Sequence, residues 1–350
     1  MKSPFPYFGG KSRVAHIVWP RFGDVPNYVE PFAGSLAVLL ARPHEPRTET
    51  VNDLDGFIAN FWRAVKHDPE GVAHYADWQP NENDLHARHA WLVERRETLV
   101  AKLEGDSDYY DAKIAGWWVW GISLWIGSGW CSGNGPWQAV ETEQGRQLLH
   151  LGNKGRGVRR QLLHLGKGQG VHRKRLHLGD KGQGVHRKRL NISRPVRDIG
   201  TNSDLYGMMH ELADRLRHVR VCSGDWSRIC GPSPTYKLGL TGVFLDPPYA
   251  TEAMRASVLY AKDDYDVAHD VRKWAIENGD NPLMRIALCG YESEHSDEMP
   301  DDWEMVAWKA GGGYAGQRKN GTNDNGSNER IWFSPYCLKV DRVRQMELLK

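Results

Sequence analysis

The chain has 350 residues, enough for one large domain or for two domains that share a core. Hydrophobic residues make up 40% and charged residues 26%, which excludes a chain disordered throughout and any fibrous protein. The longest apolar run, residues 115–126, is shorter than the roughly 18 residues of a membrane span. The amino terminus carries no apolar signal segment, so we expect a cytoplasmic protein without membrane association.

The net charge of +2 conceals an uneven distribution along the chain. Residues 146–189 hold 13 Lys or Arg and one acidic residue, Asp180, whereas the rest of the chain holds 33 basic and 43 acidic residues. Such a concentration of positive charge predicts a polyanionic partner. The five cysteines are widely spaced and have no histidines at zinc-ligand spacing, so we expect buried thiols and neither a disulfide framework nor a metal site.

The first motif opens the chain, where residues 6–12 are PYFGGKS. This segment is similar to a phosphate-binding loop but lacks the GxxxxGK[ST] spacing, which excludes a P-loop nucleotidase. A Gly-Gly-Lys turn can instead bring the Lys11 ammonium and backbone NH groups against a carboxylate.

The second motif is a strand at residues 28–30 that enters the glycine turn of YVEPFAG, followed by an apolar helix at residues 35–41. The next strand, residues 49–51, leads into Asn52 and Asp53. A carboxylate at the end of a second strand, about 20 residues after the first turn, can hold the ribose hydroxyls of an adenosine-containing ligand. Asp53 as a simple cap of the following helix is the alternative.

Helical periodicity continues over residues 56–67, 84–103 and 109–126. The last helix and its exit carry six tryptophans: Trp117, Trp118, Trp120, Trp125, Trp130 and Trp137. Because they cluster on an apolar helix, we expect them to form the core of this region rather than a surface on which bases stack.

The basic stretch is an internal repeat, in which LHLG recurs at Leu149, Leu163 and Leu176. A glycine-rich turn and a basic cluster follow each copy. The units are too short and too polar to bury a face on each neighbour, as solenoid repeats do. We therefore expect hairpins or an expanded loop, and a solvated insertion that arose by tandem duplication stays open.

After the repeat, helices at residues 203–218 and 266–278 alternate with short β-rich runs. These runs are residues 219–222, 243–245, 286–289 and 331–333. With the two earlier strands they predict a doubly wound α/β sheet that has an insertion after its second strand.

The strongest chemical signal is VFLDPPY at residues 243–249, an apolar strand that runs into Asp246, Pro247, Pro248 and Tyr249. Ligands of open α/β sheets bind beyond the carboxyl ends of the strands, which is where Asp246 is expected. The two prolines cannot continue a ladder, so a carboxylate, a backbone carbonyl and an aromatic ring are left facing one small space. Such a corner suits a planar ring with an amino group, whose two hydrogens the carboxylate and the carbonyl would accept.

Taken in order, these motifs resemble the Dam-type adenine-specific DNA methyltransferases of bacteria and phages. The family pattern runs from aromatic-Gly-Gly-Lys through Pro-Phe-x-Gly and Asn-Asp to Asp-Pro-Pro-Tyr, with an inserted target-recognition domain. The resemblance covers residues 4–67 and 203–336 and is much weaker over 70–200. This chain departs from the pattern in having Ser35 and Leu36 where the family often has a second glycine, and in its triplicated basic repeat.

The resemblance implies a Rossmann-like methyltransferase domain at residues 1–67 and 201–350. Residues 68–200 would form a mostly helical and hairpin target-recognition domain that includes the repeats at 146–190. S-adenosylmethionine is the implied cofactor. The catalytic residues would be Asp246, Pro247 and Tyr249, and the cofactor-binding residues Tyr7, Lys11, Glu30, Pro31, Phe32, Gly34, Asp53, Asp225 and Trp226.

The implied reaction is methylation of the exocyclic N6 of an adenine flipped out of double-stranded DNA, with the basic insert contacting phosphates. An ordinary strand-end turn is the alternative for Asp225 and Trp226. We expect a monomer that needs no metal, and a partner restriction endonuclease stays open. Two other functions also stay open: methylation of the cytosine N4 amine, and DNA binding without catalysis on a methyltransferase scaffold. Enzymes of the first kind more often carry Ser in place of the Asp of DPPY.

Overall fold

The computed structural model describes residues 1, 3–5, 7, 11–125, 130–131, 137–142, 145–150, 203–248, 261–308 and 329–340. The chain forms two compact units. The first comprises Met1–Lys2, Gly9–Leu54 and His218–Lys350, and the second comprises Ser3–Phe8 and Asp55–Arg217. These units are defined by packing and do not test which residues recognise a target, so the domain boundaries at residues 67 and 201 stay a prediction.

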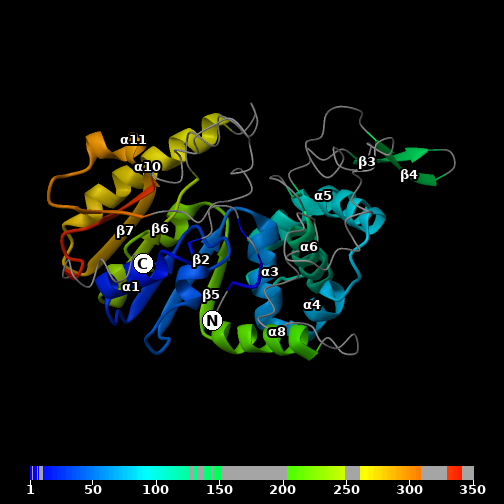
Figure 1. The fold of residues 1–350 in the computed structure, drawn as a ribbon, viewed down its shortest axis with the longest axis horizontal. Coiled ribbons are helices and arrows are strands. Elements are labelled where there is room, and N and C mark those ends of the chain that lie inside the picture. The colour runs from blue at the N-terminus through cyan, green and yellow to red at the C-terminus, as the bar shows by residue number, and fades with distance from the viewer. Residues whose placement is uncertain are drawn as a thin grey trace, which may run out of the picture. The chain divides into compact units, whose positions relative to one another are not determined.

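The first unit contains a seven-stranded sheet with the strand order β5-β2-β1-β6-β7-β9-β8 (Figure 1). Five neighbouring strands run parallel, whereas β9 is antiparallel to β7 and β8 is antiparallel to β9. The strands are β1 (Asn27–Glu30), β2 (Thr48–Asp53), β5 (Val219–Ser223), β6 (Thr241–Leu245), β7 (Met284–Tyr291), β8 (Glu304–Ala307) and β9 (Glu329–Phe333).

The strand order places a topological switch between β1 and β6. The chain winds outward from β1 through β2 to β5, and then starts again on the other side of β1 with β6 and β7. In open sheets of this kind, ligands bind in the crevice outside the carboxyl ends of the two strands at the switch. The YVEPFAG turn follows β1 and Asp246 follows β6, so both motifs lie at this crevice.

Helices cover both faces of the sheet, and β6 shows why. Val243 packs in one apolar cluster with residues of α10 (Ala261–Gly279). Gly242 faces the opposite side, where a Cβ atom would stand only 2.9 Å from the ring of Phe22 in α1 (Ala15–Phe22). In Figure 1 the yellow α10 and the blue α1 flank the strands. A parallel strand covered on both faces is buried along its whole length, as β6 is.

All six predicted strands are present and are longer at one or both ends. The edge strand β8 was not predicted. Its apolar run at residues 305–307 is short, and only one of the four strand residues is fully buried. The helix expected at residues 35–41 is a single turn, α2 (Ala37–Leu40). It is shorter because Leu36 has a φ of 51°, a left-handed conformation that cannot be part of the helix.

The described part of the second unit is mainly helical. Asp55, Asp68, Asn81 and Asp111 each begin a helix by accepting a hydrogen bond from a backbone amide of the first turn. The helices are α3 (Gly56–His67), α4 (Pro69–Ala76), α5 (Glu82–Gly105), α6 (Ala112–Leu124) and α8 (Ser203–Leu216). The predicted helices in this part of the chain are thereby confirmed, with ends shifted by a few residues, and α4 is an addition.

Aromatic rings form the core of the second unit. The Phe5 ring centroid lies 5.3 Å from that of Phe61, 5.8 Å from that of Trp62 and 5.1 Å from that of Trp118. The expected core role of the tryptophans is confirmed for Trp118 and Trp120, which are buried. Trp117, Trp125 and Trp130 are half-buried, and the side chain of Trp137 lies outside the described residues.

One hairpin precedes the repeats: β3 (Trp137–Thr142) and β4 (Gly145–His150) pair as antiparallel strands, and the last two residues of β4 begin the first repeat. Residues 151–202, and with them the rest of the first repeat and both other repeats, lie outside the described residues, so the hairpins expected for the repeats stay a prediction. No helix in the described part of the chain is long and apolar enough to cross a membrane.

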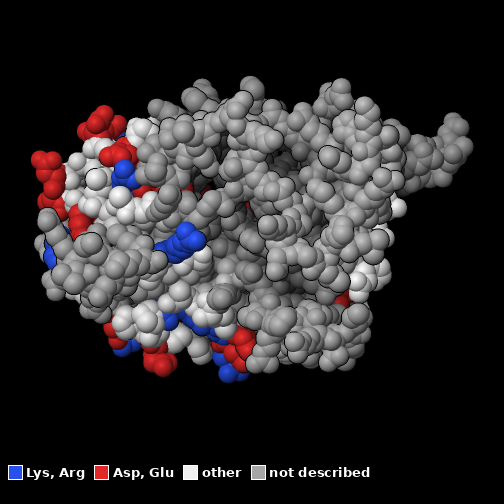
Figure 2. All heavy atoms as spheres, in the orientation of Figure 1, with Lys and Arg blue, Asp and Glu red and all other residues white. Residues whose placement is uncertain are grey.

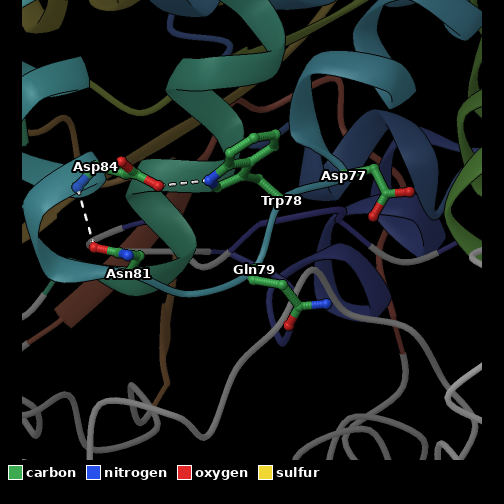
Figure 3. Close-up of a pocket in the computed structure, with 5 residues that line it drawn as sticks. All are labelled: Asp77, Trp78, Gln79, Asn81 and Asp84. Atoms are coloured by element: carbon green, nitrogen blue, oxygen red, sulfur yellow. Dashed lines mark hydrogen bonds between the residues drawn. The ribbon is translucent and has the colours of Figure 1, made fainter.

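The second unit also contains a cavity of about 310 Å³, lined by Asp77, Trp78, Gln79, Asn81 and Asp84 (Figure 3). The indole Nε1 of Trp78 donates a hydrogen bond of 2.6 Å to the Asp84 carboxylate, and the Asn81 side chain caps α5. These contacts already occupy three of the lining side chains, and none of the predicted site residues lies here.

Candidate active site

The turn after β1 is joined to the end of β2 by two hydrogen bonds. The amide of Ala33 donates to the carbonyl of Asn52 (2.8 Å), and the amide of Gly34 donates to the carboxylate of Asp53 (2.8 Å). Gly34 has a φ of 45°, a left-handed conformation that glycine adopts without a steric penalty. The two predicted motifs therefore form one structure.

Asp53 does not cap the following helix, so that alternative is wrong. The cap of α3 is Asp55, whose carboxylate accepts a hydrogen bond of 2.9 Å from the amide of Phe57. Asp53 is instead half-buried at the end of β2, where it holds the glycine turn. It keeps the position that a ribose-binding acid requires.

Asn52 ties this turn to a third one. Its side chain is 1% exposed, and Nδ2 donates to the carbonyl of Pro31 (3.2 Å) and to the carbonyl of Gly224 (2.9 Å). Gly224 follows β5, so one amide group links the turns after two strands that flank β2. The sequence pattern contained Asn52 but assigned it no role; its position next to Asp53 at a strand end was the available signal.

Two predicted aromatic residues lie side by side at this corner. The rings of Phe32 and Trp226 are stacked, with centroids 6.3 Å apart and an angle of 28° between their planes. The neighbouring Asp225 is exposed, and its carboxylate accepts a hydrogen bond of 2.9 Å from the amide of Ser227 at the start of η4 (Trp226–Ile229). That contact supports the strand-end turn for Asp225, whose cofactor contact stays a prediction.

Asp246 follows directly after β6, as predicted, and Lys11 meets it there. The Lys11 Nζ lies 3.0 Å from Oδ1 of Asp246, and the lysine side chain is 5% exposed. Lys11 thus meets a carboxylate of the chain itself, whereas Gly9 and Gly10, and with them the expected backbone NH contacts, lie outside the described residues. The first motif and the DPPY motif therefore meet at the switch point, although more than 200 residues separate them in sequence.

Sequence reasoning missed two residues that complete the cluster. Glu329, the first residue of β9, has Oε2 4.0 Å from the Lys11 Nζ, and the Trp308 ring centroid lies 5.5 Å from the same nitrogen. Because β9 runs antiparallel to β7, its first residue pairs with Tyr291 at the end of β7 and so lies at the carboxyl edge of the parallel strands. Glu329 could have been predicted from the sequence only if the direction of β9 had been known.

Burial and charge act against each other in this cluster. Burial lowers the pKa of Lys11, whereas Asp246, Cys289 and Glu329 raise it. Together the three groups outweigh burial, so the pKa is raised overall and the ammonium stays charged. Burial raises the pKa of Asp246, and Lys11 opposes that shift. Lys11 thus favours the ionised form of the carboxylate, which is the form that only accepts hydrogen bonds.

A second buried acid in the crevice is Glu30, which is 2% exposed at the end of β1. Burial raises its pKa to about 8, although the hydrogen bond of 2.9 Å donated by the Tyr28 hydroxyl favours the ionised form. Glu30 is therefore mostly protonated at neutral pH and adds little negative charge to the cluster.

Four further predicted site residues have few described contacts or none. Pro31 and Pro247 are buried, Pro31 in the turn after β1 and Pro247 directly after Asp246. Tyr7 is 39% exposed and belongs to the second unit, where its ring lies edge-on to Phe5 at 6.2 Å. Tyr249 lies outside the described residues. The roles of Tyr7 and Tyr249 stay predictions.

The crevice has the chemistry that S-adenosylmethionine requires. Asp53 offers a carboxylate for ribose hydroxyls, and Phe32 with Trp226 offers an aromatic wall for a purine ring. The carboxylates around Lys11 suit a positively charged sulfonium. In the described part of the chain, the buried Oδ1 of Asn52 accepts no hydrogen bond, so a further acceptor lies at the same corner. The residues fit the cofactor.

Comparison with known proteins agrees with this geometry. Residues 7–110 match the family model of the D12 class N6 adenine-specific DNA methyltransferases, and no curated protein matches the chain. The matched segment contains the Gly-Gly-Lys turn, the turn after β1 and Asp53. It favours adenine N6 over cytosine N4 as the target and catalysis over DNA binding alone. Residues 7–110 of this chain are thus similar to the D12 class of N6 adenine-specific DNA methyltransferases, enzymes that take their methyl group from S-adenosylmethionine.

Proposed function

We propose that this enzyme methylates N6 of an adenine that is flipped out of duplex DNA into the corner formed by Asp246 and Pro247. The observation that carries the proposal is the ion pair of 3.0 Å between Lys11 and Asp246. It joins the first family motif to the DPPY motif at the switch point of the sheet, which is where ligands of such sheets bind.

The amine needs help from the protein because its lone pair is delocalised into the adenine ring. The Asp246 carboxylate accepts one amine hydrogen and the Pro247 carbonyl accepts the other. These hydrogen bonds shift electron density toward nitrogen and favour the pyramidal geometry of attack. S-adenosylmethionine supplies the methyl group for an in-line displacement, so positioning and electrostatic preorganisation provide most of the acceleration.

Lys11 maintains the acceptor. Burial raises the pKa of Asp246, and a protonated carboxyl would present a donor to the amine. The ammonium at 3.0 Å opposes this rise and so favours the ionised carboxylate. Lys11 therefore acts on the acceptor and not only on the cofactor.

The turns around β1, β2 and β5 hold the cofactor. The Glu30–Pro31–Phe32–Gly34 turn lies under its methionine part with Tyr7 and Lys11, and Asp53 binds the ribose. Trp226 contacts the adenine ring, with Asp225 beside it. The two hydrogen bonds that Asn52 donates to Pro31 and Gly224 support this arrangement, because they fix the turn after β1 and the turn after β5 relative to each other.

Duplex DNA is the substrate that explains the charge distribution. Base flipping costs about a few kcal/mol, which stacking on Tyr249 and phosphate contacts by residues 146–189 offset. The charge of the described surface supports phosphate contacts at residues 146–189 rather than elsewhere on the described surface. Figure 2 shows acidic side chains gathered over α11 (Glu292–His295) and the segment after it, where Asp297, Glu298, Asp301 and Asp302 are exposed. Phosphates are repelled from this part of the surface.

The test is methyl transfer by Asp246→Asn with labelled S-adenosylmethionine and duplex DNA. We expect a loss of about 100-fold or more in kcat, since the amide cannot replace a charged acceptor in the transition state. DNA binding should be retained. Asp280→Asn, an exposed acid-to-amide change beyond α10, is the matched control and should transfer methyl groups at the wild-type rate. Transfer by Asp246→Asn at the wild-type rate would contradict the mechanism.

A further inference from the structure

One buried amide group holds two turns of the candidate active site together. Asn52 is 1% exposed at the end of β2, and its Nδ2 donates to the carbonyls of Pro31 (3.2 Å) and Gly224 (2.9 Å). Pro31 lies in the turn after β1 and Gly224 in the turn after β5, so the two partners belong to turns on opposite sides of β2. An amide nitrogen has two hydrogens to donate, and here each turn receives a hydrogen bond from it.

The backbone of β2 ties each of these turns to the sheet separately. The amide of Ala33 donates to the carbonyl of Asn52 (2.8 Å), and the amide of Gly224 donates to the carbonyl of Asp53 (3.2 Å). Such bonds fix each turn to its neighbouring strand. The side chain of Asn52 adds a direct link between the turns, and because the amide is planar and rigid, it fixes the spacing of their two carbonyl groups.

A second buried asparagine makes the same kind of link at the opposite edge of the sheet. Asn27 is the first residue of β1 and is 0% exposed, and its Nδ2 donates to the carbonyl of Pro234 (2.9 Å) and to Oγ1 of Thr241 (2.9 Å). In the part of the chain that the structure describes, the Oδ1 atoms of Asn27 and Asn52 both accept no hydrogen bond. The two residues therefore differ mainly in position, and Asn52 is the one at the carboxyl edge, where ligands of open sheets bind.

The proposed cofactor has two ends that contact different turns. Its methionine part is assigned to the turn after β1 and its adenine ring to the turn after β5. A ligand that has to order two separate segments of a protein loses affinity, because the ordering consumes part of the interaction free energy. Turns that are already fixed relative to each other avoid that loss.

We propose that Asn52 is a positioning residue for S-adenosylmethionine: by fixing the turn after β1 relative to the turn after β5, it lets the methionine and adenosine parts of the cofactor bind together without rearrangement of either turn. Asn52 acts through the two turns and needs no contact with the cofactor. The inference rests on the proposed function, because it takes from it the placement of the two parts of the cofactor.

The experiment compares a ligand that has both parts with one that has the adenosine part alone. Dissociation constants for S-adenosylhomocysteine and for 5′-methylthioadenosine are measured by calorimetry at pH 7, without DNA, for the wild type and Asn52→Asp. The aspartate keeps the shape of the side chain but replaces the donor by an acceptor that faces two carbonyls. We expect affinity for S-adenosylhomocysteine to fall about tenfold, which corresponds to about 1.4 kcal/mol. Affinity for 5′-methylthioadenosine should fall less than about threefold.

The readout is the ratio of the two dissociation constants. A merely structural role of Asn52 would weaken the binding of both ligands by the same factor and leave this ratio unchanged. Asn52→Ser is the second variant, so the result does not depend on the folding of Asn52→Asp. Its shorter side chain cannot span both carbonyls, and it should change the ratio in the same direction.

Asn27→Asp is the matched control, because it removes the same buried donor from the same sheet at the edge away from the crevice. Its ratio should equal that of the wild type, even where its free energy of unfolding is lower. An unchanged ratio in the Asn52 variants, or an equal change in Asn27→Asp, would overturn the inference. The proposed function would still stand if the wild type binds S-adenosylhomocysteine and Asp246→Asn loses methyl transfer. A wild type that binds neither ligand would overturn both.

Discussion

A buried cation in each unit shows two different uses of positive charge. In the first unit Lys11 lies between the carboxylates of Asp246 and Glu329. In the second unit Arg88, 7% exposed in α5, lies among aromatic rings. Its guanidinium carbon is 4.9, 4.8 and 4.4 Å from the ring centroids of Trp78, Trp117 and Trp120, respectively.

The surroundings decide what each cation can do. The carboxylates raise the pKa of Lys11 against the effect of burial, so its charge is strengthened and can act on Asp246. Burial lowers the pKa of Arg88, with only Asp84 opposing. A guanidinium among tryptophan rings contributes packing and cation–π attraction. The comparison therefore predicts that Lys11 serves chemistry and that Arg88 serves stability.

The largest expected effect is that of Lys11→Met on methyl transfer. Without the ammonium, the pKa of Asp246 rises further, because Lys11 is the group that lowers it. We expect kcat/KM to fall about 100-fold at neutral pH, or about 2.7 kcal/mol. Since removal of Lys11 moves the ionisation of the acceptor to higher pH, the activity of the variant relative to the wild type should rise with pH. A pH profile parallel to that of the wild type would contradict this role of Lys11.

The second effect concerns stability and separates Arg88 from Lys11. Arg88→Ala leaves a cavity among three rings and should lower the free energy of unfolding by about 2–4 kcal/mol. Arg88→Met keeps most of the volume and should cost less. Urea unfolding followed by tryptophan fluorescence measures both.

The matched control for Arg88 is Arg95→Ala on the same helix, where a half-exposed guanidinium lies 3.8 Å from the Trp91 ring centroid. It should cost about 1 kcal/mol or less. Affinity for S-adenosylmethionine should stay at the wild-type value in all three arginine variants. If Arg88→Met weakened cofactor binding, the division between the two cations would be wrong.

The last expected effect is a dependence of stability on pH that arises in the first unit. The pKa of Glu30 is about 8 in the folded protein and 4.5 in its ordinary state, so the folded state binds the proton more tightly. The free energy of unfolding should therefore fall as pH rises from about 4.5 to about 8. Glu30→Gln keeps an acceptor for the Tyr28 hydroxyl and should flatten this fall in thermal melts. Arg88→Met should leave the slope as in the wild type; equal slopes in wild type and Glu30→Gln would exclude Glu30 as its source.

Local pattern was sufficient for most of the fold. The strands β6 and β7 are central and parallel, so they are covered on both faces and appear in the sequence as short apolar runs. The edge strand β8 also has a short apolar run, but only one of its four residues is fully buried, and the run alone did not identify it as a strand. The left-handed backbone at Leu36, which shortens α2, has no local signal either, since leucine rarely adopts it.

Some residues of the site could likewise be predicted from the sequence, and others could not. Lys11 and Asp246 were predictable because a glycine turn and a proline-stopped strand each place a charged group at a chain reversal, whatever the surroundings. Glu329 was not, because its role depends on β9 running antiparallel to β7. In a parallel strand, the same residue would stand at the opposite edge of the sheet.

The sequence by itself indicated the likeness to one family, and with it the cofactor and the motifs, because these depend on short segments whose backbone and chemistry are set by the residues within them. The tertiary structure decided which charges share a space. Three side chains that lie at positions 11, 246 and 329 become one cluster only when strand order and strand direction bring their chain segments to one edge of the sheet. Pairing between strands is a long-range interaction, so a strand's own residues do not specify its neighbour or its direction.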